Sequence, residues 1–192
     1  MLELLAPAGN LDAVIAAVQN GADAVYMGFG DGFNARRSAD NFTRESFAKA
    51  VRYCHIRGCK VYVTLNTLVN DREMRDAVAA AKLASDAGAD ALIVQDLGMS
   101  YAIRCALPDI PLHASTQMSL HNLAGVEAAA EMGITRAVLA RELSFEQIRF
   151  ITKNASIETE VFVHGALCFC HSGQCYMSAL IGRRSGNRGM CA

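Results

Sequence analysis

Four of the seven cysteines of this 192-residue chain lie close together near its end, after an apolar segment. Cys168, Cys170, Cys175 and Cys191 follow the spacing C-x-C-x4-C-x15-C, among Gly, Ser and Arg residues without a helical pattern. Thiolates in such a loop hold an iron–sulfur cluster or a structural zinc ion, and a cysteine beside a histidine can act as a nucleophile. The spacing favours the cluster and zinc equally over the nucleophile, although Cys168 and Cys170 are closer than a usual zinc pair. A chance grouping is the remaining interpretation.

Polar side chains also lie within or directly after three of the apolar segments. They are His113, Gln117, Arg141, Glu142, Glu160 and His164. Taken singly, each has an ordinary alternative: His113 can be a satisfied core histidine, and Arg141 with Glu142 can be a local ion pair. If the segments are parallel strands of a barrel, however, these groups meet at one rim and describe a ligand pocket. The catalytic interpretation of these residues therefore depends on the barrel.

The segment GFGDGFNARR is glycine-rich and carries Arg36 and Arg37. Backbone N–H groups in such loops bind anions, and the two arginines could hold an anionic group of a substrate. The segment lacks the lysine of a phosphate-binding loop and the glycine spacing of a dinucleotide site. A loop that simply needs positive φ angles is the alternative that we favour.

Four segments repeat one pattern, in which an Ala-rich amphipathic helix is followed by a glycine and an apolar strand. Gly21, Gly58, Gly88 and Gly133 occupy the position where a helix ends in a left-handed residue. We expect strands at residues 3–6, 24–27, 60–65, 91–94, 111–113, 137–140 and 158–163. We expect helices at residues 11–20, 44–57, 71–87, 99–106, 123–132 and 145–153. The expected helix N-caps are Asn10, Thr43, Asn70 and Ser144, the last in a capping box with Gln147.

Seven apolar strands alternating with helices indicate an α/β fold with parallel strands covered on both faces. We favour a TIM-like (β/α) barrel over a doubly wound sheet, because the unit is regular and no dinucleotide fingerprint follows the first strand. The chain ends near the seventh strand, so we expect an incomplete barrel of about seven units. Residues 1–165 form the barrel portion in this interpretation, and residues 166–192 form the Cys-rich segment.

The composition is that of a globular chain, with 52% hydrophobic residues and a formal net charge of -1. A near-neutral balance gives no overall attraction to nucleic acid or to a membrane surface. The N-terminal residues lack the pattern of a signal peptide, and no apolar run reaches the ~20 residues that a membrane helix needs. We therefore expect a cytoplasmic protein without a membrane partner, in which clustered cysteines bind metal or do chemistry.

Several segments together resemble the peptidase U32 family, also called the collagenase-like protease family. They are ELLAPAG, GADAVYMG, VTLNT, ALIVQDLG, LHASTQ, AVLARELS and, most specifically, EVFVHGALCFCHSGQCYMS with RSGNRGMC. The resemblance covers essentially the whole chain and implies a TIM-like barrel. It also implies two different functions, because the family was named for protease activity while bacterial members resemble RNA hydroxylation proteins. Those proteins hydroxylate a tRNA wobble uridine or a 23S rRNA cytidine, with prephenate as an implicated metabolite.

The resemblance further implies a [4Fe-4S] cluster held by four cysteines. Cys168, Cys175 and Cys191 match the ligand positions, and a fourth cysteine would lie beyond Ala192. Cys170 occupies a position where relatives usually lack cysteine, so it stays outside the expected set. Relative to the family the Cys-rich segment is thus truncated, and zinc is the alternative metal.

Three functions follow from these observations. The first is iron–sulfur-dependent hydroxylation of an RNA base, with His113, Gln117, Arg141 and Glu160 positioning the substrate. The second is a peptidase, for which the sequence has neither an HExxH motif nor a G-x-S-x-G motif and offers only a pairing of Cys168 with His164. The third is a non-catalytic scaffold whose barrel end is held together by the metal.

Overall fold

Seven parallel strands form one curled sheet in the computed structural model, which describes residues 2–30, 33–35, 42–166 and 168–191. The strands pair in chain order, so each strand lies beside its predecessor and the sheet stays open between the first and the last. They are β1 (Leu5–Pro7), β2 (Ala24–Met27), β3 (Lys60–Leu65), β4 (Ala91–Val94), β5 (Leu112–Ala114), β6 (Arg136–Val138) and β7 (Glu158–Glu160). The chain is therefore an incomplete TIM-like barrel, as the repeated pattern predicts.

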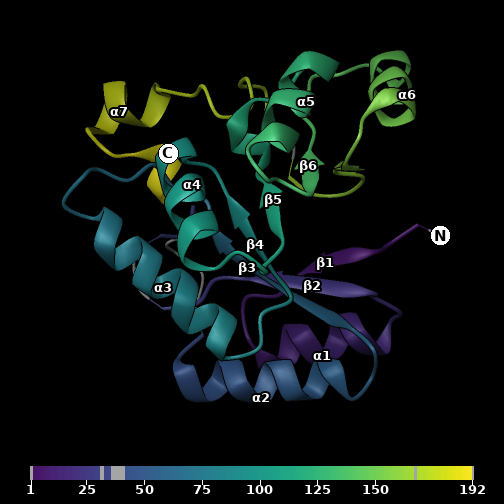
Figure 1. The fold of residues 1–192 in the computed structure, drawn as a ribbon, viewed down its shortest axis with the longest axis vertical. Helices are drawn as coiled ribbons and strands as arrows, with labels where there is room; N and C mark the ends of the chain where they lie inside the picture. Colours follow the sequence, from purple (N-terminus) through teal and green to yellow (C-terminus); the bar gives the residue numbers. More distant parts are fainter. Residues whose placement is uncertain (1, 31–32, 36–41, 167, 192) are drawn as a thin grey trace.

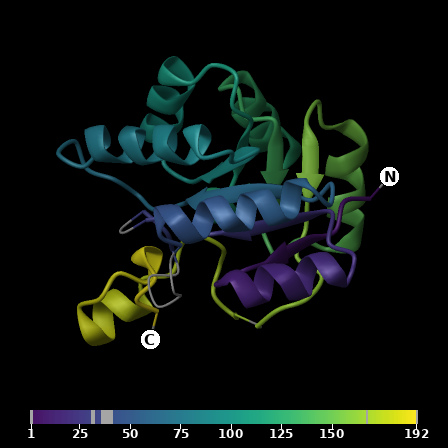
Figure 2. The same cartoon turned by 90° about the horizontal axis from the view of Figure 1, so that it is seen from below.

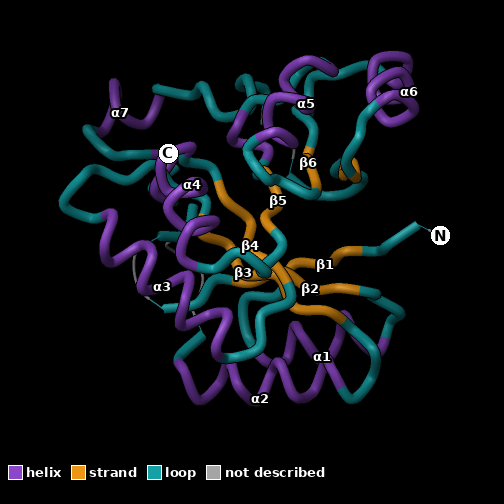
Figure 3. Tube along the Cα trace, in the orientation of Figure 1, coloured by secondary structure: helices purple, strands orange, loops and turns teal. Residues whose placement is uncertain are grey.

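Helices alternate with the strands and surround them, as the tube in Figure 3 shows. They are α1 (Leu11–Gln19), α2 (Arg44–His55), α3 (Met74–Asp86), α4 (Leu97–Ala106), α5 (Leu123–Glu131), α6 (Phe145–Asn154) and α7 (Met177–Gly182), with the short 3-10 helices η1 (Thr116–Met118) and η2 (Gly186–Arg188). Helix α1 packs beside α2, and α3 packs beside α4, along the outside of the sheet (Figures 1 and 2). No helix of the described segments is long and apolar enough to cross a membrane.

Local sequence signals set most of the helix ends. Asn10 and Thr43 cap α1 and α2 by accepting hydrogen bonds from backbone N–H groups, and Ser144 with Gln147 forms the expected capping box of α6. Gly58 and Gly88, which follow α2 and α3, have φ angles of 72° and 99°. Such angles are inexpensive only for glycine, so these residues fix the turn from helix to strand.

Two of the differences from the expected elements arise where a side chain bonds to the backbone at the start of a helix. Asn70 does not cap α3; it is tied to Glu73 by two hydrogen bonds, and the helix begins one turn later at Met74. Helix α4 begins earlier than expected, because Asp96 accepts a hydrogen bond from the N–H of Met99. Strand β7 ends at Glu160 instead of residue 163, and α7 was not expected at all.

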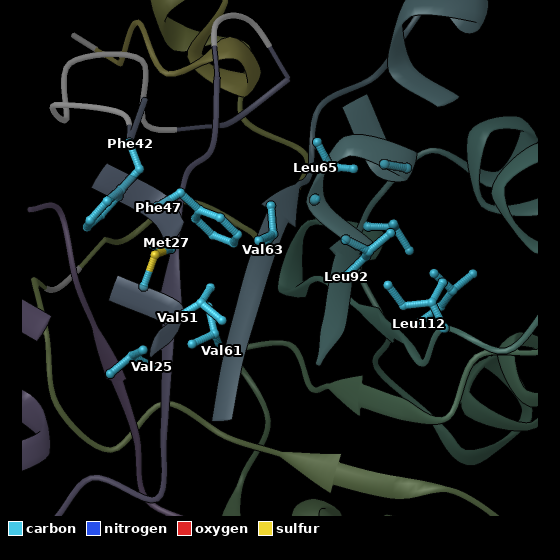
Figure 4. Close-up of a cluster of buried hydrophobic side chains, with 14 of the residues drawn as sticks. Val25, Met27, Phe42, Phe47, Val51, Val61, Val63, Leu65, Leu92 and Leu112 are labelled. Carbon is cyan, nitrogen blue, oxygen red and sulfur yellow. The ribbon is translucent and has the colours of Figure 1, made fainter. Parts of the chain in front are cut away.

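Alternate residues of the strands serve two different layers. Val25, Val61 and Val63 face the helices and pack with Phe47 and other side chains in the largest apolar cluster (Figure 4). The intervening residues, such as Tyr62, face the concave interior with Ala24, Ala91 and Ile93. Because both faces are buried, the strands lack the polar–apolar alternation of a sheet with one wet face.

Replacing Phe47 by Ala should cost about 3–5 kcal/mol of unfolding free energy, because its fully buried ring would leave a cavity against the sheet. Its ring centroid lies 4.5 Å from that of Phe29, so an aromatic contact is lost as well. Urea denaturation of the full chain measures the difference. The control is Leu83→Ala on α3, whose side chain is 45% exposed and should cost far less. Equal losses for the two variants would contradict this description of the core.

Candidate functional site

The Cys-rich segment packs onto the loops that follow β5 and β6. Its anchor is Ser172, which is buried and contacts groups from both loops. The Ser172 N–H and hydroxyl donate to the two carboxylate oxygens of Glu142 at 2.6 and 2.7 Å, and Ser119 Oγ donates to the Ser172 carbonyl at 2.6 Å. In a parallel barrel, loops after the strands form the face where ligands bind. The cysteines are thus held at that face.

Gly173 allows this close approach. Its φ is +74°, and a Cβ built there would lie 2.2 Å from the carbonyl oxygen of Gln117 in η1. Only glycine fits, because any side chain would collide with the backbone and strain the turn. The Ser172–Gly173 dipeptide therefore determines where the segment rests.

A second anchor holds the far end of the segment. The Arg188 guanidinium donates to both carboxylate oxygens of Glu73 at 2.6 and 2.7 Å and to the carbonyl oxygen of Leu68 at 2.7 Å. This bidentate pair joins η2 to the loop between β3 and α3, where the yellow end of the chain lies in Figure 1. The segment from Cys168 to Cys191 is therefore fixed to the barrel at two places.

Arg141 holds the backbone of the first two cysteines. Its Nη1 and Nη2 donate to the carbonyl oxygens of Cys168 and Cys170 at 3.4 and 3.1 Å. A hydrogen bond from the Cys170 backbone, and then the Arg141 guanidinium, lower the pKa of the exposed Cys168 thiol. A lowered pKa increases the thiolate fraction, and the thiolate is the form that binds metals and attacks electrophiles.

The thiols are gathered without forming a compact set. Cys170 Sγ lies 3.4 Å from Cys175 Sγ, and this shared hydrogen bond raises the pKa of Cys170 to about 11. Among the described residues, no three cysteine sulfurs lie within 4.8 Å of one another. A zinc ion ~2.3 Å from each sulfur would bring tetrahedral ligands within roughly 4 Å of each other, whereas a larger cluster separates its thiolates further. Free thiols that are exposed, or half-buried at Cys170, fit metal ligation chemically, and both a cluster and zinc remain open. Cys170, which the sequence interpretation set aside, lies among them.

His113 and Glu160 occupy a different place, in the concave interior of the sheet. Arg136, at the start of β6, is the centre of a group of polar side chains there. It donates hydrogen bonds to Glu3 and Glu158, and its Nη1 lies 3.6 Å from Glu160 Oε2. His113 lies in the middle of β5 and not at its end, and its ring meets Tyr62 edge-on at 4.8 Å. The expectation that all the candidate groups share one rim is therefore wrong.

Burial and hydrogen bonds together set the charges of this interior cluster, meaning Glu3, Tyr62, His113, Arg136, Glu158 and Glu160. Burial would raise the pKa of Glu3, but hydrogen bonds from Arg136, Tyr62 and Lys60 outweigh it and lower that pKa to about 2. Burial raises the pKa of Glu160, and burial followed by the Arg136 charge lowers the pKa of His113 to about 3. His113 is thus neutral, and its Nδ1 has no hydrogen-bond partner among the described residues.

A cavity of about 630 Å³ opens beside the interior cluster. Its lining includes Lys60, Ala91, His113, Arg136 and Glu158, so it reaches residues at or near the starts of five strands, β3 to β7. Active sites of such barrels lie at the other face, at the C-terminal ends of the strands. The cavity is therefore on the side away from the cysteines.

The remaining candidates are placed more simply. Gln117 lies in η1, where its carbonyl oxygen accepts from Gln95 Nε2 at 3.4 Å and borders Gly173. His164 is exposed in a bend after β7. Arg36 and Arg37 lie outside the described residues, so the anion-binding interpretation of their loop stays a prediction. The sequence analysis did not anticipate the contact of Ser172 with Glu142. The only sequence signal for it is the Ser172–Gly173 dipeptide, which is typical of a tight turn.

Comparison with known proteins identifies the class to which this fold and cysteine segment belong. The profile of peptidase family U32 matches residues 9–192, so the chain is a member of that family. A solved U32 peptidase covers 88% of this chain with a TM-score of 0.74, and its 16% sequence identity speaks for the fold alone.

Curated relatives carry two kinds of name. The chain is 43% identical over 191 residues to a 23S rRNA 5-hydroxycytidine synthase of Escherichia coli, covering all of this chain and 28% of the relative. It is 41% identical to a tRNA hydroxylation protein of Bacillus subtilis, covering 98% of this chain and 44% of the relative. A protein of Porphyromonas gingivalis named collagenase is 36% identical, and the match covers 99% of this chain and 48% of that relative. The chain thus spans less than half the length of these relatives.

Replacing Gly173 by Ala should release the Cys-rich segment from the barrel. The left-handed φ costs an alanine about 1–2 kcal/mol and the collision with Gln117 adds to it, so local opening should rise about tenfold or more. Limited proteolysis within residues 168–191 measures the opening. Gly186→Ala is the matched control, because its Cβ would meet only ordinary contacts beginning at 3.4 Å. Unchanged proteolysis of Gly173→Ala would refute the docking.

Stability should fall in mild acid because of His113. Its pKa is lowered from 6.5 to about 3 in the folded chain, so the unfolded chain binds the extra proton as pH drops through that window. Protonation of the unfolded state then removes about 2 kcal/mol between about pH 7.5 and about pH 5.

The His113→Gln variant, which cannot titrate, should lose less stability over the same pH interval, and urea denaturation at both pH values measures the difference. His164→Gln changes an exposed histidine and should behave like the wild type. If His113→Gln and the wild type showed the same pH dependence, the buried neutral histidine would be excluded.

Proposed function

We propose that this chain is the barrel portion of an RNA-modifying enzyme that hydroxylates a nucleobase, either a 23S rRNA cytidine or a tRNA uridine. The observation that carries the proposal is the docking of the cysteines through Ser172 and Glu142 at the strand-end loops. That face is where barrels do chemistry. The names of the two most similar relatives reported above support the same reaction class.

In this proposal a [4Fe-4S] cluster is held by Cys168, Cys175 and Cys191, with a fourth cysteine beyond the chain. The cluster would supply one-electron chemistry. Arg141 would keep the cysteine backbone in place and favour the thiolate of Cys168, as its hydrogen bonds indicate. Cys170 lies beside Cys175 and is the alternative fourth ligand.

The candidate residues have different parts in this proposal. Gln117, whose backbone carbonyl borders the docked segment, would contact a substrate near the cysteines, and His164 is exposed just before them. His113 and Glu160 belong to the interior cluster and would stabilise the barrel, not contact RNA. The prephenate-like metabolite stays a prediction, which addition of prephenate to the reaction would test.

RNA binding would rest largely on parts outside this chain. The formal net charge is -1, whereas RNA-binding surfaces carry an excess of Lys and Arg. The relatives are more than twice as long as the matched region, which leaves room for such surfaces. An RNA substrate would also place the protein in the cytoplasm, as expected from the sequence.

A peptidase is the second candidate, favoured by the family name and by the relative named collagenase. Its machinery would need a cysteine joined to a histidine base. In the described part of the chain, no hydrogen bond joins Cys168 to His164 or His171. His171 instead faces Glu142, at 3.2 Å from Nδ1 to Oε1. This geometry supports the peptidase less than the hydroxylase.

The test is complementation of a strain that lacks the full-length protein, with mass spectrometry of nucleosides from rRNA and tRNA. Wild type should restore one hydroxylated nucleoside, and Cys175→Ser should reduce it to background because a thiolate ligand is lost. The matched control is Cys105→Ser, an exposed cysteine on α4, which should restore the nucleoside fully.

Iron and sulfide analysis of anaerobically purified wild type and Cys175→Ser supplies the second readout. Iron and sulfide bound to the wild type and reduced in the variant would support the cluster. A folded Cys175→Ser protein that still makes the base would favour the scaffold. Peptide cleavage without any change in RNA would favour the peptidase.

A further inference from the structure

Three side chains from separate segments converge beside the cysteines without belonging to them. Glu142 Oε1 lies 3.3 Å from His121 Nε2 and 3.2 Å from His171 Nδ1, and one ligand atom of each residue lies within 4.8 Å of the others. His121 follows η1, Glu142 follows β6, and His171 is in the Cys-rich segment. Among the described residues this is the one group of three metal-binding side chains at such distances.

The hydrogen bonding of His121 determines which of its nitrogens faces the group. Its Nδ1 lies 2.6 Å from the carbonyl oxygen of Ser119, which can only accept, so Nδ1 carries the hydrogen. In the neutral ring, Nε2 then points a lone pair at the Glu142 carboxylate. Two acceptors face each other only when a proton or a cation lies between them. Histidine ligands of metals usually donate their second ring N–H to a backbone carbonyl or carboxylate, as His121 does.

Glu142 is oriented in the same way that metal-binding carboxylates are. Its Oε2 accepts from the Ser172 hydroxyl at 2.7 Å and its Oε1 from the Ser172 N–H at 2.6 Å. Burial would raise the pKa of Glu142, but these bonds from Ser172 outweigh it and lower the pKa to about 2. The carboxylate is therefore charged and fixed at neutral pH, which removes part of the cost of binding a cation.

We propose that His121, Glu142 and His171 bind one divalent transition metal ion, Fe²⁺ or Zn²⁺, at a site separate from the thiolates. Bonds of about 2.0–2.2 Å to one ion place neighbouring ligand atoms roughly 3.0–3.5 Å apart, as both carboxylate–imidazole pairs already are. The remaining adjustment falls on His171, whose side chain is 77% exposed. Two imidazoles and one carboxylate with open positions suit Fe²⁺ or Zn²⁺, whereas Mg²⁺ and Ca²⁺ prefer oxygen alone.

The site would join the Cys-rich segment to the barrel. Two of its ligands belong to loops after strands, and the third directly follows Cys170. An ion here would hold the segment where Ser172 and Arg141 already hold it. The inference does not require that the thiolates bind an iron–sulfur cluster, and it goes beyond the proposed hydroxylation.

Cobalt titration of the full-length protein tests the site. Replacing Cys168, Cys170, Cys175 and Cys191 by Ser, together with the fourth cysteine of the proposed cluster, removes the thiolates near the site. Co²⁺ should then bind to one site with visible ligand-field bands and without intense thiolate charge-transfer absorption. His121→Ala and His171→Ala should each weaken binding by more than about 100-fold, because loss of an outer-shell partner alone costs about 10–100-fold. His55→Ala, which changes a histidine on α2 outside the site, should leave affinity unchanged.

Cadmium NMR of the protein with its cysteines intact supplies a measurement that does not depend on folding of the serine variant. A resonance in the nitrogen–oxygen range that disappears in His171→Ala would support the site. Cadmium signals confined to the thiolate range would overturn it. If His55→Ala lost as much cobalt binding as His171→Ala, or if His171→Ala lost none, the proposal would also be overturned and the three residues would form only a histidine–carboxylate ion pair.

Discussion

The contact between Ser172 and Glu142 is the interaction on which the functional interpretation depends. A buried serine satisfies both oxygens of a carboxylate with its N–H and its hydroxyl, and so attaches an irregular segment to a rigid sheet. Hydrogen bonds to a charged group contribute about 1.5–3 kcal/mol each, which is enough to order a loop that has little apolar burial of its own. Without this contact the first three cysteines would be held only through Arg141 and through the distant Arg188–Glu73 pair.

The interior cluster around Arg136 stabilises the sheet and does not hold the cysteines. Arg136 joins the carboxylates of Glu3, Glu158 and Glu160, of which Glu158 is 69% exposed. Removal of Arg136 would leave the largely buried Glu160 without its cation, whereas Glu3 would keep its hydrogen bonds from Lys60 and Tyr62. The cluster joins the segment before β1 to strands β6 and β7, across the opening between the first and last strands. It holds the curl of an incomplete barrel, which explains why chemically attractive residues such as His113 and Glu160 lie away from the cysteines.

Family membership, fold and site together narrow the functional question to the segment that carries the cysteines. The same family contains relatives named for RNA hydroxylation and a relative named collagenase, so membership alone does not choose between them. The contacts favour the function that we propose, because in the described part of the chain no hydrogen bond joins Cys168 to His164 or His171, whereas Arg141 holds the backbone of Cys168 and Cys170. A His–Glu–His site beside them would make the strand-end face a place with two kinds of metal ligand.

The sequence by itself determined the repeating units, the parallel sheet, the cysteine segment and the helix caps at Asn10, Thr43 and Ser144. These features follow from patterns within a few residues: hydrophobic period, a glycine with positive φ and a side chain beside a free N–H. Which residues meet was decided only by the tertiary structure. His113 points into the interior because it alternates along β5 with Leu112 and Ala114, which pack against the helices. His121, Glu142 and His171 come together from positions up to 50 residues apart along the chain. The curl of the sheet sets such distances, and no local pattern records it.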